Sequence, residues 1–241
     1  MFLNGKNMIA KFKQGCGDIL IVERRSSLKA NKRFLYEGHF EGYTKNYTFQ
    51  IYEAKSGRVK NLEKPNLNGF FVGKHNTIKS IYYVWKNMER RCYDPRSKYY
   101  NNYGAKGVTV DVRFKNYEFF ESWYLEHWDG NSKVAIDKDC LSYGRDHKIY
   151  SPETCLLLPR EINMFISSLG TGIYKVNRKL PYCVNYRRKN KKLAKNFETK
   201  EDAINFKKQI DLQYLEELFK KYSIKEKVKH IIKHYVEIFV C

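Results

Sequence analysis

The sequence predicts an α+β protein built from small sheets and separate helices. Residues 1–78 read as short alternating stretches divided by Gly, Asn and Ser clusters, which are typical of strands and turns. Residues 80–94 and 199–222 carry apolar side chains at the three- and four-residue spacing of amphipathic helices. Residues 170–199 contain three more strand-like stretches, so a second sheet is expected next to the later helix.

The composition is that of a folded, strongly basic chain. Of the 241 residues, 42% are hydrophobic and 16% aromatic, which is ample for packed cores. The 46 Lys and Arg residues against 26 Asp and Glu give a formal charge of +20. A charge this large favours a polyanionic partner, and we expect nucleic acid ahead of an acidic protein or a membrane surface.

Nothing in the sequence suggests a membrane or secreted protein. No run of about eighteen apolar residues is present, and the start of the chain lacks the apolar stretch of a secretory signal. The six cysteines are scattered without a C-x-x-C pair, which argues against a zinc ribbon or a thioredoxin-type motif. We therefore expect reduced thiols and a cytoplasmic protein.

The N-terminal unit, residues 1–78, is predicted to be β-rich. Its strands are expected in DILIVERR, KRFLYEGHF, YTFQIYEA and GFFVGK. The stretch GRVKNLEKPNLNG, with its proline and asparagines, is expected to be an exposed loop.

The central module, residues 79–168, is predicted to contain two helices and a strand pair leading into a third helix. Ser80 is the expected N-cap of the first helix, and Asp94 before Pro95 is its expected end. The second helix is expected in NYEFFESWYLEHW, the strand in VAIDKD, and the strand or loop before the third helix in PETCLLLPREINMFISSL. Helical spacing predicts a core role, in preference to stacking on bases, for Trp85, Phe119, Phe120, Trp123 and Trp128.

The C-terminal module, residues 169–222, is predicted to be a three-stranded sheet packed on a long helix, and residues 223–241 an added helix or strand. Thr199 resembles a helix cap with Asp202 in the capping-box position. Alternation within PYCVNYRRK places Tyr182, Val184 and Tyr186 towards the helix and Cys183, Asn185 and Arg187 outwards.

The outward side of this sheet is the predicted DNA contact. A sheet in the major groove would use Asn185 and Arg187 on base edges and the surrounding cations on phosphates. The alternative is a solvated hairpin whose lysines only maintain solubility. The candidate nucleic-acid-binding residues are Asn185, Arg187, Arg188, Lys189, Lys191, Lys192, Lys195 and Arg178.

Several segments together resemble a known family. WKNMERRCYD, YNNYGAKGVTVDVRFKNYEFFESWYLEHW and AIDKDCLSYGRDHKIYSPETCLLLPREIN resemble phage-borne HNH-type homing endonucleases. GTGIYKVNRKLPYCVNYRRKNKKLAKNFETKEDAINF resembles the DNA-binding domain of plant ethylene-response factors, which occurs fused to such nucleases. The resemblance runs from about Ser80 to Tyr222. It implies a ββα module around one divalent metal, double-stranded DNA as partner, and a phage or mobile-element protein acting in a bacterial cytoplasm.

The chain departs from the family at its central motif. In the family a His-x-Asp pattern supplies a histidine base that activates water, and an Asn-Leu pair opens the helix. Here Asp137-Lys138-Asp139 takes the place of His-x-Asp, and Thr154-Cys155 takes the place of Asn-Leu. A second alignment puts Lys138 in the position of the base, and neither alignment restores a histidine.

Two interpretations of this motif stay open. Asp137 and Asp139 would share one face of a strand and could bind one Mg²⁺, with His147 as a base if its loop folds back. Alternatively, Asp139 hydrogen-bonds the turn, Asp137 pairs with a nearby cation and His147 is exposed. The resulting hypotheses are a metal-dependent endonuclease or nickase, an inactive relative that binds DNA as a regulator, and an inhibitor that binds a host protein.

The other candidate features are weaker. Arg90 and Arg91, with Lys86, are expected either to contact phosphate or only to complement a helix C-terminus. His230 and His234 are four apart but lack the companions of a metal motif, so we expect surface positions. No glycine pattern supports nucleotide hydrolysis.

Overall fold

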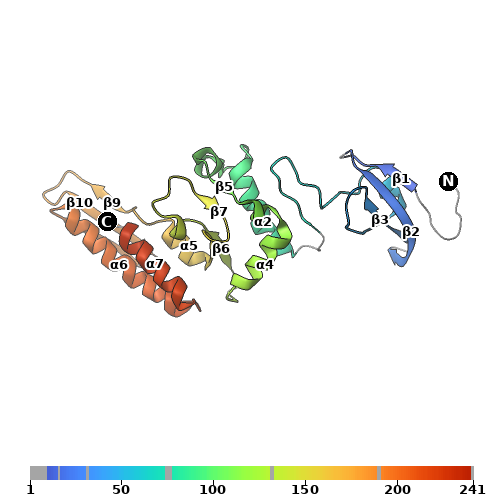
Figure 1. Cartoon of the computed structure of the whole chain (residues 1–241). Coiled ribbons are helices and arrows are strands. Elements are labelled where there is room, and N and C mark those ends of the chain that lie inside the picture. The colour runs from blue at the N-terminus through green and yellow to red at the C-terminus, as the bar shows by residue number, and fades with distance from the viewer. Residues whose placement is uncertain are drawn as a thin grey trace. The chain divides into compact units, whose positions relative to one another are not determined.

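A computed structural model describes residues 10–15, 17–30, 33–73, 78–130, 133–188 and 191–239. It has the expected α+β architecture, with helices and several small sheets (Figure 1). The chain forms two compact units, the first comprising Met1–Tyr82 with Lys115–Glu121 and the second comprising Tyr83–Phe114 with Ser122–Cys241.

The first unit is built on a four-stranded antiparallel sheet whose strands follow the chain order. The strands are β1 (Ala10–Lys13), β2 (Ile19–Ala30), β3 (Arg33–Phe40) and β4 (Tyr47–Phe49), followed by helix α1 (Ile51–Lys55). Alternate residues of the strands face a small core, as the pleat requires. That core contains Leu20, Val22, Phe40, Tyr47, Phe49 and Ala54.

Two predictions for this unit are wrong. Residues 51–55 form helix α1 instead of continuing a strand, because the Gln50 N–H donates to Glu53 Oε2 at 2.8 Å and caps a helical turn. GFFVGK does not form a strand within residues 69–73 that the structure describes. Only Phe71 pairs, as an isolated bridge to Asn116. The predicted loop before it is confirmed.

Helix α2 (Lys79–Tyr93) begins the central module, and the helices and strands of this module are short. After α2 come the 3₁₀ turns η1 (Tyr100–Asn102) and η2 (Gly104–Lys106), strand β5 (Thr109–Val110), helices α3 (Val112–Lys115) and α4 (Tyr117–His127), strand β6 (Val134–Asp137), the 3₁₀ turn η3 (Cys140–Ser142), strands β7 (Ile149–Tyr150) and β8 (Leu156–Pro159), and helix α5 (Arg160–Ile166).

Strands β6 and β8 pair antiparallel, with Val134 opposite Pro159 and Asp137 opposite Leu156. Helix α5 starts directly after β8 and packs against both strands. The expected ββα arrangement is therefore present. Strands β5 and β7 form a separate parallel pair.

Helix α2 ends at Tyr93, before Asp94-Pro95, as predicted. It begins at Lys79, so Ser80 lies inside its first turn and is not the N-cap. The aromatic prediction holds for Trp85, Phe120 and Trp123, which are buried. It is wrong for Phe119 and Trp128, which are 38% and 43% exposed. Phe119 lies on a side of α4 that does not face the core, and Trp128 lies beyond the end of α4 at His127.

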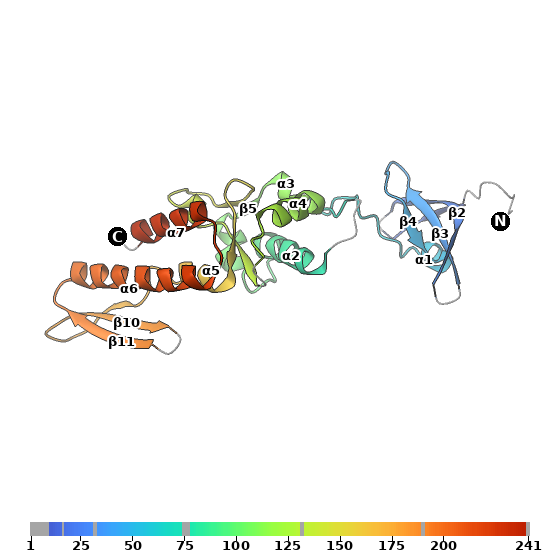
Figure 2. The ribbon, with the colours of Figure 1, turned by 90° about the horizontal axis from the view of Figure 1, so that it is seen from below.

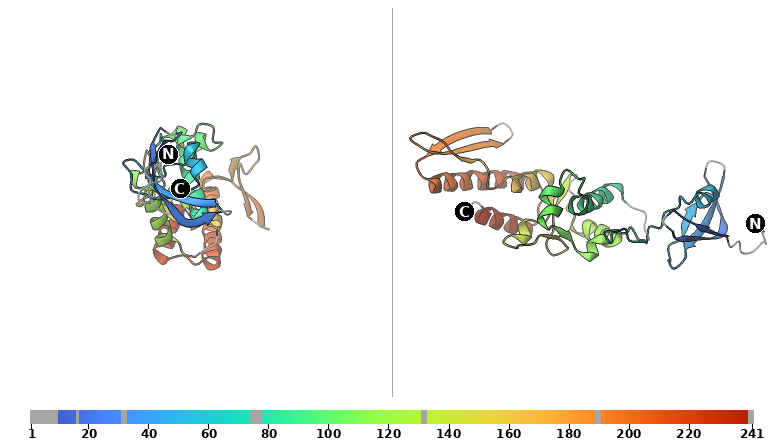
Figure 3. Two further views of the ribbon diagram at one scale, coloured as in Figure 1. Left: turned by 90° about the vertical axis from the view of Figure 1, so that its right-hand side faces the viewer. Right: turned by 90° about the horizontal axis from the view of Figure 1, so that it is seen from above.

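The C-terminal part of the second unit is a three-stranded sheet with two helices. Strands β9 (Ile173–Lys175), β10 (Tyr182–Arg188) and β11 (Lys191–Phe197) pair antiparallel with β10 in the centre. Helix α6 (Lys200–Lys221) lies between this sheet and helix α7 (Glu226–Phe239), as Figure 2 and Figure 3 show from opposite sides. Thr199 caps α6 as predicted, since its Oγ1 accepts the Asp202 N–H at 3.0 Å.

One apolar core joins the ββα arrangement to the C-terminal helices. It contains Leu158, Ile162, Phe165 and Ile166 from β8 and α5, Tyr214, Leu215, Leu218 and Phe219 from α6, and Ile232, Tyr235 and Val236 from α7. Within α6, Lys207 and Asp211 form a buried ion pair, and both side chains are almost fully enclosed. His230 and His234 are exposed on α7, as expected.

Among the described residues, no helix is both long enough and apolar enough to cross a membrane.

Candidate nucleic-acid interface

The sheet of β9, β10 and β11 has one face on α6 and one face open. Val184 and Tyr186 are 0% and 7% exposed against the helix, whereas Asn185 and Arg187 are exposed on the other side. This confirms the orientation predicted from the alternation of PYCVNYRRK. Residues directly opposite each other in an antiparallel pair point to the same side, so the register identifies the rest of that side.

We call this open side the outward face. Cys183 is opposite Tyr174 on β9 and Asn196 on β11, while Asn185 is opposite Ala194 and Arg187 is opposite Lys192. The face therefore combines amides, cations and one tyrosine. Its members are Tyr174, Cys183, Asn185, Arg187, Lys192, Ala194 and Asn196.

Arg187 and Lys192 are like charges directly across the β10–β11 pair. Such a pair is destabilising unless an anion neutralises it. Within the described parts of the chain, neither side chain has an ion pair with a carboxylate. The outward face thus carries two neighbouring cations available to an external anion.

Gly172 fixes the backbone beneath Asn185. The Asn185 N–H donates to the Gly172 carbonyl at 2.7 Å, which continues the β9–β10 pairing by one residue. Gly172 has φ +91°, and a Cβ there would lie 2.8 Å from the Asn185 oxygen. Only glycine allows this approach, so it holds the backbone of Asn185 in register.

The other predicted contacts have different surroundings. Lys195 lies on the helix side, where its ammonium is 4.7 Å from the ring centroid of Phe206 on α6. Arg178 is exposed in the turn between β9 and β10. Arg188 and Lys191 end β10 and begin β11, and only their backbone is described. Lys189 lies outside the described residues.

At the end of β6, Asp137 serves the turn that follows. Its side chain is 3% exposed, and its Oδ1 accepts the N–H groups of Asp139 at 3.1 Å and Cys140 at 2.9 Å. Burial raises the pKa of this carboxyl, although the Cys140 N–H opposes the shift. Asp137 therefore caps η3 (Cys140–Ser142) from inside the protein.

Asp139 is held by two lysines. The Lys138 ammonium lies 3.0 Å from Oδ1, and Lys148 forms an ion pair with the same oxygen. Burial tends to raise the pKa of Asp139, but these two ammonium groups outweigh it and lower the pKa. His147 is exposed on the loop, and in the described chain no hydrogen bond or ion pair joins it to either carboxylate.

Mg²⁺ prefers several oxygen ligands with free lone pairs. Asp137 is enclosed and bonded to two N–H groups, and Asp139 is neutralised by two lysines, so in this arrangement the pair does not fit a Mg²⁺ site. Metal binding would first require the lysines to leave Asp139. No cluster of three or more His, Cys, Asp or Glu side chains suited to a metal occurs among the described residues.

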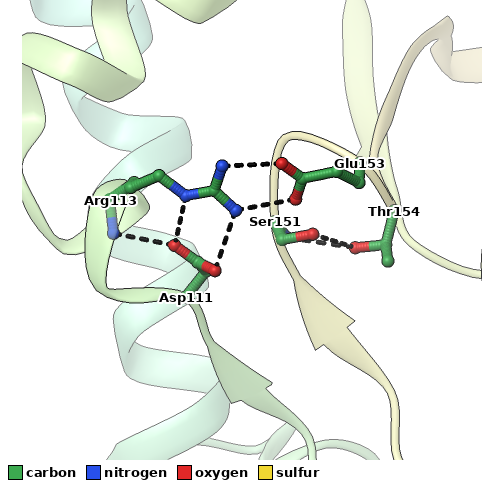
Figure 4. Close-up of polar contacts among 5 residues, drawn as sticks. All are labelled: Asp111, Arg113, Ser151, Glu153 and Thr154. Atoms are coloured by element: carbon green, nitrogen blue, oxygen red, sulfur yellow. Dashed lines mark hydrogen bonds and ion pairs between the residues drawn. The ribbon is translucent and has the colours of Figure 1, made fainter.

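A polar cluster fixes the segment before β8 (Figure 4). The Arg113 guanidinium donates to both Glu153 oxygens at 2.6 and 2.7 Å and to Asp111 Oδ1 at 2.9 Å. Beside it, Thr154 Oγ1 accepts the Ser151 N–H at 3.1 Å. The segment is thereby tied to the end of β5.

Thr154 and Cys155 therefore precede a strand. The alignment with the Asn-Leu pair implied that they open the helix, and this is wrong, because α5 begins at Arg160 after Pro159. Both residues are buried, and burial raises the pKa of the Cys155 thiol to about 12.

Beside β6 the second unit has a cleft of about 940 Å³. Helix α2, residues 96–99, strand β6 and helix α5 line it. Of the cations that line this cleft, the sequence predicted possible phosphate contacts only for Arg90 and Arg91. Its charged lining consists of Arg90, Arg91, Arg96, Lys98, Lys138, Arg160, Asp137 and Asp139.

No family model matches the chain, and no curated protein or solved structure is significantly similar to it.

Proposed function

We propose that this protein binds double-stranded DNA through the outward face of its C-terminal sheet. The observation that carries the proposal is the cross-strand pair Arg187 and Lys192, two cations that face outwards beside Asn185 without carboxylate partners in the described chain. The formal charge of +20 supports the same class of partner. The resemblance of residues 170–206 to a DNA-binding domain agrees with it.

The chemistry of the face suits the major groove. A guanidinium such as Arg187 can donate two hydrogen bonds to guanine, and an amide such as Asn185 can pair with adenine. Lys192 and Arg178 would contact phosphates and set the orientation of the sheet. Val184 and Tyr186 pack the central strand against α6, so the strand that presents Asn185 and Arg187 is held in a fixed position.

Duplex DNA binding, measured by fluorescence anisotropy at several salt concentrations, tests the proposal. Affinity should fall steeply with salt, because each neutralised phosphate releases counterions. Arg187→Ala should weaken binding by about 1–3 kcal/mol and relax the preference at one base pair. Lys227→Ala, which removes an exposed cation from α7, is the matched control. Binding that ignores salt, or that survives Arg187→Ala and Lys192→Ala unchanged, would contradict the proposal.

Metal-dependent cleavage is a separate question. Because Asp139 is occupied by two lysines, we expect DNA binding without nicking of supercoiled plasmid in Mg²⁺ or Mn²⁺. Nicking that both Asp137→Ala and Asp139→Ala abolish would instead establish a nickase. In either case the resemblance to phage proteins suggests action in a bacterial cytoplasm. Tight, salt-insensitive binding to a host protein would favour the inhibitor hypothesis.

A further inference from the structure

The cleft between α2, β6 and α5 has a large excess of positive charge. Six cationic side chains line it against the two carboxylates Asp137 and Asp139. Asp137 is buried and engaged with the backbone, and Asp139 is shared by Lys138 and Lys148. The carboxylates of the lining therefore leave most of its cations uncompensated.

Two of these cations lie above the same pair of aromatic rings. The Lys138 ammonium is 4.8 Å from the Tyr103 ring centroid and 5.8 Å from that of Tyr150. The Arg91 guanidinium carbon is 5.3 and 6.0 Å from the same two centroids. Cation–π contacts offset part of the cost of enclosing the charges, but they leave both charges positive.

The Lys138 and Arg91 side chains at the floor of the cleft are largely enclosed by protein. Lys138 is only 6% exposed, and Tyr150 beneath it is 1% exposed. Asp139 Oδ1 lies 3.0 Å from the Lys138 ammonium and compensates part of its charge, whereas the Arg91 guanidinium has no carboxylate partner in the described chain. A buried charge without a partner is costly, and an external anion would relieve that cost. Arg91, with the buried Lys138 near the same two rings, therefore leaves positive charge at the floor of the cleft that an anion could neutralise.

More cations surround the opening. Arg90 and Arg160 are exposed on α2 and at the start of α5, and Lys98 is exposed on the connecting loop. None of these three has an ion pair within the described residues. Arg96 differs, because its Nε lies 3.0 Å from Asp94 Oδ1.

We propose that the cleft is a phosphate-binding site that works without a metal ion. Arg91 and Lys138 would hold the phosphate oxygens at its floor, and Arg90 and Arg160 would hold them at its rim. The ligand chemistry is a phosphoryl group with two or more charges, either in a nucleic-acid backbone or in a free nucleotide or pyrophosphate. The proposal does not depend on the role of the outward face, which uses other residues.

The first experiment titrates the full chain with inorganic pyrophosphate by calorimetry, in EDTA. We expect binding, and we expect the double variant Arg90→Gln/Arg160→Gln to weaken it at least tenfold. Both positions are exposed, so the fold should persist, as a thermal melt would verify. Lys138→Met tests the floor, and Lys227→Gln is the matched control for loss of one charge.

The second experiment measures duplex DNA affinity for the same variants, with and without pyrophosphate. Competition between pyrophosphate and DNA would support the site with the DNA backbone as ligand. Pyrophosphate binding that the double variant weakens, without competition from DNA, would support it with a free phosphate compound as ligand. Pyrophosphate binding that the double variant leaves unchanged, with unchanged DNA affinity, would overturn it. Weaker DNA binding by the double variant, without pyrophosphate binding, would also support a backbone ligand. No pyrophosphate binding together with unchanged DNA affinity in the double variant would overturn the proposal.

These results separate the two proposals. Lys192→Ala, on the outward face, should weaken DNA binding and leave pyrophosphate affinity as in the parent chain. If the parent chain binds no DNA but binds pyrophosphate, the role of the outward face fails and the cleft proposal stands. If DNA binding depends on Arg187 and Lys192 alone and pyrophosphate does not bind, the outward face is the DNA contact and the proposal for the cleft is wrong.

Discussion

Lys192→Glu should make the protein more stable and a poorer DNA binder at once. Lys192 is directly opposite Arg187 on the outward face, so the substitution turns a like-charge cross-strand pair into an opposite-charge pair. Neither side chain has a carboxylate partner in the described chain that the change would disturb.

The size of both effects follows from the geometry. Cross-strand charge pairs contribute roughly 0.2–1 kcal/mol, so reversing the sign should raise the unfolding free energy by about 1 kcal/mol at low salt. That corresponds to about 2–4 °C in melting temperature for a unit of this size. For DNA, one lost phosphate contact lowers the slope of log K against log salt by about 0.9, or about eightfold in affinity at 0.1 M salt.

The assay pairs thermal melts with anisotropy titrations on one protein preparation. Lys192→Ala separates loss of the cation from gain of the carboxylate, and Lys227→Glu controls for the change in net charge. A stabilised Lys192→Glu variant with unchanged DNA affinity would refute the assignment of the outward face. A destabilised variant would refute the argument that the opposed charges repel.

Two further predictions concern ion pairs. Asp211→Ala should destabilise the protein by about 3–5 kcal/mol in urea unfolding, because it strands the buried Lys207 ammonium, and a double Lys207→Met/Asp211→Leu variant should recover most of the loss. In the Figure 4 cluster, Arg113 lowers the pKa of Asp111 and of Glu153 below their ordinary values of 3.8 and 4.5. The ion pairs of Arg113 with these carboxylates therefore stabilise the fold above the ordinary pKa values. That stabilisation is lost as the pH falls through the lowered pKa values of the folded protein. The stability difference between the parent and Arg113→Ala should shrink between pH 5 and pH 3, and an unchanged difference would contradict the assigned pairing.

The periodic spacing of apolar residues was sufficient to predict the long helices from the sequence. Helix α2 and helix α6 were predictable because their apolar residues recur on one side, and Thr199 and Pro95 mark their ends. The outward placement of Asn185 and Arg187 was predictable because a strand alternates strictly. Such patterns are local, so a single stretch of sequence contains them.

The cleft was not predictable, because its charges come from distant segments. Arg91, Lys138 and Arg160 meet only when α2, β6 and α5 pack together. The partners of Asp139 were also missed, since Lys148 lies nine residues away across η3. Tertiary packing likewise decided that Phe119 faces solvent although its neighbour Phe120 is fully buried.

The shared apolar core limits how the C-terminal sheet and α6 could be reused. Phe165 from α5 contacts Tyr214 on α6, and Ile232 and Val236 from α7 are completely enclosed in the same core. Cutting the chain after Tyr222, or transplanting residues 169–222 alone, would expose this apolar surface to water. The sheet and α6 therefore do not form a unit that can be moved alone into another protein. A fusion protein that borrows its DNA-facing side should carry α5 and α7 with it.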